Sequence, residues 1–169
     1  GDVRLDPSSP ATHGDQVTTR SAGDRRSALE AAERRAITLF DEIERAGLVA
    51  PGRTEREIAV DIYSLAHERF GIEKFWHRRI VRAGPNTLTT AWDHPSNRTV
   101  EPDDTVYVDL GPVFEDWEAD VGRTYSLGPS AVKRRLVDDL ERVFVRVQKH
   151  ARATPDITVA ELFACAGRA

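Results

Sequence analysis

The sequence TVYVDLGPVFEDWEADVGRTY, residues 105–125, contains two runs in which apolar residues alternate with other residues. Alternation with a period of two is typical of half-buried β-strands. We expect the two runs to form an antiparallel hairpin that turns at Phe114 and Glu115. This register would place Asp109 directly opposite Asp120. The hairpin therefore predicts two carboxylates on adjacent strands.

The predicted hairpin has two chemically different faces. One face is expected to pack in the core and carries Val106, Val108, Leu110, Ala119, Val121, Tyr125 and, as its single charge, Arg123. The other face is expected to serve chemistry or to face water and carries Asp109, Gly111, Asp116, Glu118, Asp120, Gly122 and Thr124, with Tyr107 and Val113 as its larger apolar members.

Two carboxylates at directly opposed hairpin positions need a compensating partner. Their Cβ atoms would lie about 4.5–5.5 Å apart, where like charges destabilise the pairing. A divalent cation, or two cations about 3.5–4 Å apart, would compensate, because hard metal ions prefer carboxylate oxygens and acidify bound water. The alternative is that Asp109 and Asp120 both lie on a solvated face, with one of them protonated or paired with an arginine.

Helices and further strands are predicted on both sides of this hairpin. The expected elements are helices over 24–47, 54–70 and 130–151 and strands over 75–82, 105–114 and 119–127. Residues 1–22 are rich in polar residues, Pro and Gly, so we expect a flexible leader there. Residues 23–169 are expected to form one partial domain. The element order predicts an α+β fold.

A short pattern recurs after the first and third predicted helices. Residues 51–58 read Pro-x-x-Thr-x-x-Glu-Ile, and residues 155–162 read Pro-x-x-Thr-x-x-Glu-Leu, 104 residues later. Each copy contains a capping box, in which a Thr and a Glu three residues later bond each other's backbone N–H groups. The repeat indicates an internal duplication, with chance recurrence of a common cap as the alternative. Because strands follow only the first copy, we expect this chain to be a fragment.

Charge and cysteine content limit the classes of partner. The 169 residues include 24 Lys plus Arg and 28 Asp plus Glu, a formal net charge of -4. The interspersed charges give no basic face for a phosphate backbone, and no apolar run approaches the roughly 18–20 residues that cross a bilayer. We expect neither nucleic acid nor a membrane as a partner. A single cysteine, Cys165, cannot form an internal disulfide, which favours a cytoplasmic location.

The hairpin sequence resembles the signature of a known enzyme family. Residues 109–111 read Asp-Leu-Gly and residues 120–125 read Asp-Val-Gly-Arg-Thr-Tyr. They look like the D-x-G and D-x-x-R-T-F motifs of the pita-bread metallopeptidases, which include methionine aminopeptidase, aminopeptidase P, prolidase and their relative creatinase. The eleven-residue spacing of the aspartates also matches. The resemblance runs from residue 24 to the end and implies the pita-bread fold, as its first half-repeat plus the start of the second.

The resemblance implies a site of two divalent metal ions, usually Mn or Co, with Asp109 chelating one ion and Asp120 bridging both. It implies an exopeptidase of the aminopeptidase P and prolidase branch that uses a metal-activated hydroxide at peptide N-termini. Its partner would be a peptide, and a homodimer is left open. The family completes the site with one His and two Glu from its second half, for which the residues after Asp120 offer no match. The alternatives are a creatinase-like C–N hydrolase without metal and a non-catalytic binding module.

The family also has a first-half histidine that lies near the substrate and is not a metal ligand. Counting back from Asp109 places this position at Trp92, with His94 two residues later. We expect His94 to take the catalytic role if the loop is rearranged, and a solvated loop histidine is the alternative. His77 is a weaker candidate for the same role and is expected to be a sheet-face residue.

Overall fold

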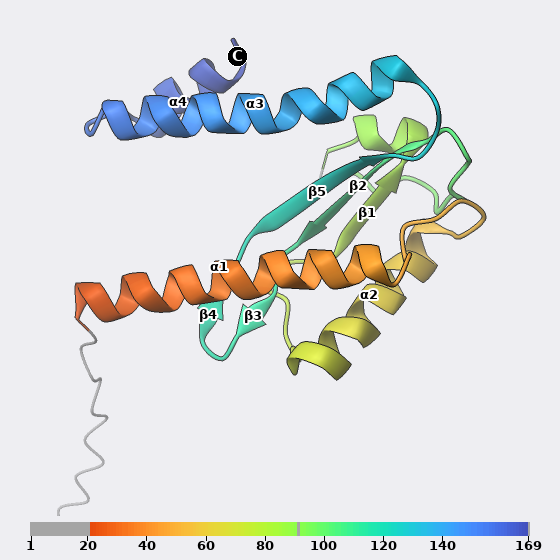
Figure 1. Cartoon of the computed structure of the whole chain (residues 1–169), viewed down its shortest axis with the longest axis horizontal. Coiled ribbons are helices and arrows are strands. Elements are labelled where there is room, and N and C mark those ends of the chain that lie inside the picture. Colours follow the sequence, from red (N-terminus) through yellow and green to blue (C-terminus); the bar gives the residue numbers. More distant parts are fainter. Residues whose placement is uncertain (1–20, 91, 169) are drawn as a thin grey trace, which may run out of the picture.

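The computed structural model describes residues 21–90 and 92–168. Apart from its last two residues, the leader predicted for 1–22 lies outside the described residues. Helices α1 and α2 lie beside a small antiparallel sheet, and α3 starts after β5 and runs back across the view, apart from α1 and with α4 against it (Figure 1). The mixture of helices and antiparallel strands confirms the predicted α+β class.

The first two helices are amphipathic, and α2 begins and ends at its predicted caps, whereas α1 begins and ends two residues earlier than predicted. Helix α1 (Ala22–Arg45) begins after the N-cap Ser21, which forms a capping box with Asp24. Its buried face consists of Ala32, Ala36, Leu39, Phe40 and Ile43. Helix α2 (Glu55–Phe70) is capped by Thr54 and ends at Gly71, whose φ of 66° lies in the left-handed region that glycine adopts without strain.

Three strands form the central sheet, in the order β1-β2-β5. These are β1 (Ile80–Ala83), β2 (Thr105–Leu110) and β5 (Val121–Ser126), all antiparallel to their neighbours. The short strands β3 (Val113–Phe114) and β4 (Trp117–Glu118) extend the hairpin as a separate ribbon. The ladder is interrupted at Gly111 and Pro112, because proline has no N–H to donate. A 3-10 helix, η1 (Gly84–Leu88), follows β1.

The predicted hairpin register is wrong by two residues. Asp109 pairs with Gly122 and not with Asp120, and Val113 pairs with Glu118. The turn lies one residue later than expected, at Glu115 and Asp116, because Glu115 adopts a φ of 59° that is rare outside glycine. A shift of two residues keeps every side chain on its predicted face.

The predicted core face of the hairpin is confirmed. Val106, Val108 and Leu110 are fully buried within the cluster that includes the apolar faces of α1 and α2. Arg123, the one charge on this face, lies over the Phe40 ring, with its guanidinium carbon 5.1 Å from the ring centroid. Its Nη1 donates to Glu44 of α1 at 2.7 Å. The sheet is thereby tied to α1 by both packing and charge.

The strand predicted over 75–82 is wrong in its first half. Only Ile80–Ala83 forms a strand, and Phe75 makes an isolated bridge to Pro112. The segment before β1 lies beside Gly111 and Pro112, where the hydrogen-bond ladder of the hairpin is interrupted. It therefore has no regular strand to pair with. The backbone N–H of Trp76 bonds to the oxygen of Gly111 at 2.8 Å.

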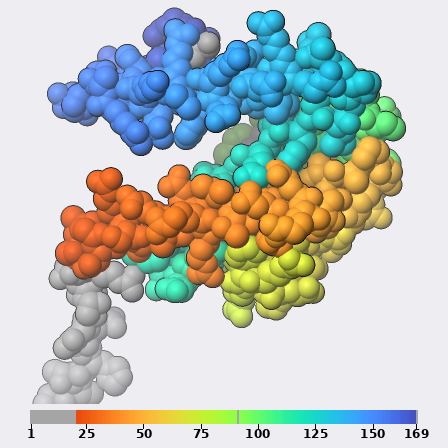
Figure 2. Space-filling model, in the orientation of Figure 1, coloured from red at the N-terminus to blue at the C-terminus, as the bar shows by residue number. Residues whose placement is uncertain are grey.

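The third helical region leaves its apolar side uncovered by the described residues. Helix α3 (Ala131–Ala153) carries the exposed side chains of Val132, Leu136, Leu140 and Phe144. Figure 2 shows an open groove between α3 and α1.

Helix α4 (Val159–Ala166) begins with a Thr158–Glu161 capping box, so both predicted capping boxes are confirmed. The internal duplication stays a prediction. No helix in the described ranges is long and apolar enough to cross a membrane.

Candidate metal centre

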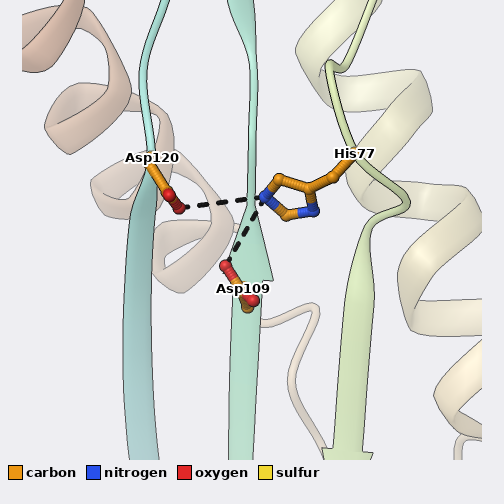
Figure 3. Close-up of side chains that lie close together, drawn as sticks. All are labelled: His77, Asp109 and Asp120. Atoms are coloured by element: carbon orange, nitrogen blue, oxygen red, sulfur yellow. Dashed lines mark ion pairs between the residues drawn. The ribbon is translucent and has the colours of Figure 1, made fainter. Parts of the chain in front are cut away.

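Three potential metal ligands converge at the end of the central sheet. His77, Asp109 and Asp120 each offer a ligand atom, and these atoms all lie within 4.8 Å of one another (Figure 3). The Nε2 atom of His77 is 3.7 Å from Oδ1 of Asp109 and 3.8 Å from Oδ1 of Asp120. The described residues contain no other such group of three or more His, Cys, Asp or Glu side chains.

The fold brings the two aspartates together despite the corrected register. Asp109 lies on β2 and faces Gly122, while Asp120 lies in the link between β4 and β5, two residues before Gly122. Diagonal neighbours on adjacent strands remain within reach of each other. The link is held by the Ala119 N–H, which donates to the Pro112 oxygen at 3.0 Å.

Trp76 fixes the position of His77. The Trp76 indole N–H donates to the Ala119 oxygen at 3.0 Å, and the Trp76 and His77 rings meet edge-on at 4.4 Å between centroids. The Nδ1 atom of His77 lies 2.8 Å from the Arg78 backbone oxygen. A carbonyl oxygen only accepts hydrogen bonds, so Nδ1 carries the proton and the lone pair of a neutral ring is on Nε2. That lone pair points toward two carboxylates, an arrangement that a cation stabilises.

The donor set fits a metal ion. Two atoms bound to one ion at about 2.1 Å each can lie up to about 4.2 Å apart. The His77 separations of 3.7 and 3.8 Å fall within this limit. Metal-bound histidines generally donate their other ring N–H to a carbonyl or carboxylate, as His77 does to the Arg78 oxygen. Carboxylate oxygens and an imidazole nitrogen suit divalent ions such as Mn²⁺, Co²⁺ and Zn²⁺.

Gly111 leaves the space that His77 and Trp76 occupy. A Cβ at position 111 would lie 2.5 Å from Cδ2 of His77 and 2.5 Å from Nε1 of Trp76. We expect Gly111→Ala to displace both rings, to cost about 1–3 kcal/mol of stability through overpacking, and to weaken metal binding. Urea unfolding and calorimetric Mn²⁺ titration measure the two effects.

Gly122→Ala is the matched control for Gly111→Ala. A Cβ at position 122 would meet only the Val108 oxygen, at an ordinary 3.5 Å. Equal losses of stability in the two variants would contradict the close packing of Trp76 and His77 on Gly111.

Asp109 is destabilised in its ionised form when no cation is present. Burial raises the pKa of Asp109, His77 opposes this effect, and the Asp120 carboxylate adds to it. A raised pKa means that the folded chain holds this proton more tightly than the unfolded chain does. The metal-free protein therefore gains stability from this group as pH falls through the folded pKa, and at neutral pH the ionised carboxylate costs stability.

Replacing Asp109 with Asn should therefore stabilise the metal-free protein at neutral pH. We expect Asp109→Asn to gain roughly 0.5–1 kcal/mol, a small effect because 37% of the side chain is exposed. The gain should shrink in acid, where wild-type Asp109 is protonated. Urea unfolding in chelator at pH 7 and at acidic pH measures it, with Asp116→Asn in the exposed turn as control. A less stable Asp109→Asn protein at pH 7 would contradict this pKa direction.

The structure does not bring His94 into the cluster. His94 is exposed in the loop after η1 and lines a different cleft, beside Arg82. The side chain of Trp92 is also exposed, at 89%. The histidine that lies beside the aspartates is His77, which was the weaker candidate from the sequence. Its position just before β1, the strand that pairs with β2, was the sequence feature that could have indicated this contact.

Comparisons with known proteins identify the family. The sequence model of metallopeptidase family M24 matches residues 27–169. The chain is 32% identical to an Xaa-Pro dipeptidase of Lactobacillus helveticus over 115 residues, 68% of this chain and 30% of that protein. The chain therefore belongs to metallopeptidase family M24, which confirms the resemblance seen in the hairpin.

Solved structures agree on the fold. The X-Pro aminopeptidase of Thermotoga maritima superposes with a TM-score of 0.62 at 25% identity, over 77% of this chain and 36% of that one. The dipeptidase PepE of Mycobacterium ulcerans superposes with a TM-score of 0.56 at 28% identity, over 83% of this chain and 38% of that one. The fold is thus the pita-bread fold that was predicted, and the chain spans about a third of the length of these relatives.

Proposed function

We propose that the protein acts as a metal-dependent exopeptidase that hydrolyses peptide bonds at N-termini, on substrates of the Xaa-Pro type. The single observation that carries this function is the convergence of His77, Asp109 and Asp120 in a chain of the M24 family. The Xaa-Pro dipeptidases and the X-Pro aminopeptidase among its relatives support the substrate class. The single free cysteine, Cys165, supports a cytoplasmic location.

We assign the metal ligands as follows. Asp109, Asp120 and Nε2 of His77 would hold the divalent ions, with Mn or Co as the proposed metals. The Asp109 side chain is 37% exposed and that of Asp120 is 67% exposed, so both carboxylates are accessible to ions from solvent.

The chain's own residues prepare the site for hydrolysis. When bound, the ions supply Lewis-acid activation of water and of the scissile carbonyl. Asp109 and Asp120 would offset part of the charge of the ions, and the His77 ring, fixed by its bond to the Arg78 oxygen, would restrict their position. We propose that His94 assists on the substrate side, reaching the peptide from its exposed loop.

A peptidase assay with matched substrates tests this function. The full-length protein should cleave Ala-Pro in the presence of Mn²⁺ or Co²⁺, lose activity in chelator, and regain it when metal is restored. N-acetyl-Ala-Pro, which lacks the free amino terminus, should be a poor substrate. Cleavage that persists in chelator would favour creatinase-like chemistry. Metal binding without any hydrolysis would favour a non-catalytic module.

A further inference from the structure

Trp76 lies over the same face of the hairpin as the candidate metal ligands. Gly111 follows Asp109 by two residues, so the two positions point to one face. A Cβ at position 111 would lie 2.5 Å from Nε1 of Trp76 and 2.7 Å from its Cδ1. The same Cβ would lie 2.5 Å from Cδ2 of His77, whose Nε2 faces Asp109. The indole of Trp76 therefore covers Gly111, next to the metal centre.

Three contacts hold the indole in place. The backbone N–H of Trp76 donates to the Gly111 oxygen at 2.8 Å, and its indole N–H donates to the Ala119 oxygen at 3.0 Å. The ring also meets the His77 ring edge-on, with 4.4 Å between centroids. A side chain fixed in this way loses little further freedom when a ligand packs on it.

The exposed part of Trp76 is purely apolar. The residue is 44% exposed although it lies beside three buried or half-buried neighbours. Its one side-chain donor is already bonded to the Ala119 oxygen, and an indole has no acceptor. The surface that remains open can therefore only make apolar or aromatic contacts. Fixed aromatic rings of this kind are typical of recognition surfaces.

The register of the sheet places Trp76 and the cleft along β1 on opposite sides of Asp109. Tyr107 and Gly111 lie two residues before and two residues after Asp109. Tyr107 pairs with Arg82, which lines the cleft of about 420 Å³, whereas Gly111 lies under Trp76. A peptide cleaved at Asp109 extends by one residue on its N-terminal side and by the rest of its chain on the other. The cleft has room for the longer part, which leaves the side of Trp76 to the N-terminal residue.

We propose that Trp76 is a specificity-determining residue that contacts the side chain of the substrate's N-terminal residue and favours large apolar side chains. This inference rests on the proposed exopeptidase function and narrows its substrates. The Cβ atom of that residue lies two bonds from the scissile carbonyl carbon. Two residues of a strand span about 6.4–6.8 Å, so the indole over Gly111 is close enough to Asp109 for a long side chain to reach. Glycine at the N-terminus makes no such contact.

Leu-Pro and Gly-Pro test this preference in the full-length, metal-loaded protein. We expect kcat/KM to favour Leu-Pro by at least about tenfold, because even one additional methylene in an apolar site is typically worth that much. Trp76→Ala should bring the ratio close to one. Trp76→Phe keeps an aromatic ring and should retain most of the preference. A wild-type ratio near one overturns the proposal without any variant.

The ratio separates contact with substrate from support of His77. Both Trp76 variants lose the bond to Ala119 and so loosen the metal centre, but at saturating Mn²⁺ this lowers the turnover of both peptides by the same factor. Leu29→Ala truncates an apolar side chain of similar exposure, 48%, on α1 and should keep the wild-type ratio. Equal losses with both peptides in Trp76→Ala would give Trp76 a structural role only and overturn the proposal.

Binding measurements separate this proposal from the proposed function. Calorimetry in chelator, where no turnover takes place, should show roughly tenfold tighter binding of Leu-Pro than of Gly-Pro to the wild-type protein. This difference would stand even if neither peptide were cleaved with metal, a result that would count against the peptidase function alone. Equal binding of the two peptides, together with their cleavage at equal kcat/KM, would overturn the role of Trp76 and leave the peptidase function in place.

Discussion

Mn²⁺ affinity falls at least about 100-fold when Asp109 or Asp120 is replaced with Asn, as a calorimetric titration should show. Each change removes a charged ligand oxygen from the group around Nε2 of His77. Changes in residues that only support metal ligands typically cost 10–100-fold, so the loss of a ligand should exceed that range. His77→Ala removes the imidazole ligand and should also cost at least about 100-fold by the same reasoning.

Two controls locate the effect in the cluster. Asp116→Asn removes an exposed carboxylate from the turn of the same hairpin and should leave Mn²⁺ affinity unchanged. His94→Ala, outside the cluster, should also leave it unchanged, although it is proposed to affect turnover. Unaltered Mn²⁺ uptake in both Asp109→Asn and Asp120→Asn would remove the metal assignment.

Phe40→Ala should cost about 3–5 kcal/mol of folding stability, the largest expected loss from a single core substitution. The Phe40 ring is 2% exposed and lies at the centre of the contact between α1 and the sheet, under the guanidinium of Arg123. Its removal leaves a cavity and also deprives Arg123 of its aromatic partner. The free energy of unfolding, from urea titration followed by circular dichroism, measures the loss.

Leu29→Ala, on the same helix, provides the matched control for Phe40→Ala. The Leu29 side chain is 48% exposed, so its truncation should cost less than about 1 kcal/mol. Similar losses in the two variants would mean that α1 does not cover the sheet as the structure shows.

The faces of the hairpin were predictable from sequence, and its register was not. Alternation assigned Val106, Val108 and Leu110 to the core correctly, because a shift of two residues leaves the faces unchanged. The turn depends on Glu115, whose positive φ is not a preference of glutamate. The register therefore followed from tertiary packing and not from local sequence.

The histidine of the site could not be chosen from spacing alone. His77 reaches the aspartates because Trp76 bonds to the oxygens of Gly111 and Ala119, two positions far from it in sequence. A strand over residues 75–82, as predicted, would have fixed His77 in a regular ladder.

Diffraction from crystals grown with Mn²⁺, measured at the manganese absorption edge, is the most direct test of the metal centre. An anomalous peak should lie among Nε2 of His77 and the carboxylate oxygens of Asp109 and Asp120, about 2.0–2.3 Å from its ligands. No peak at this position, or a peak only at other surface carboxylates, would contradict the assignment of these residues as metal ligands.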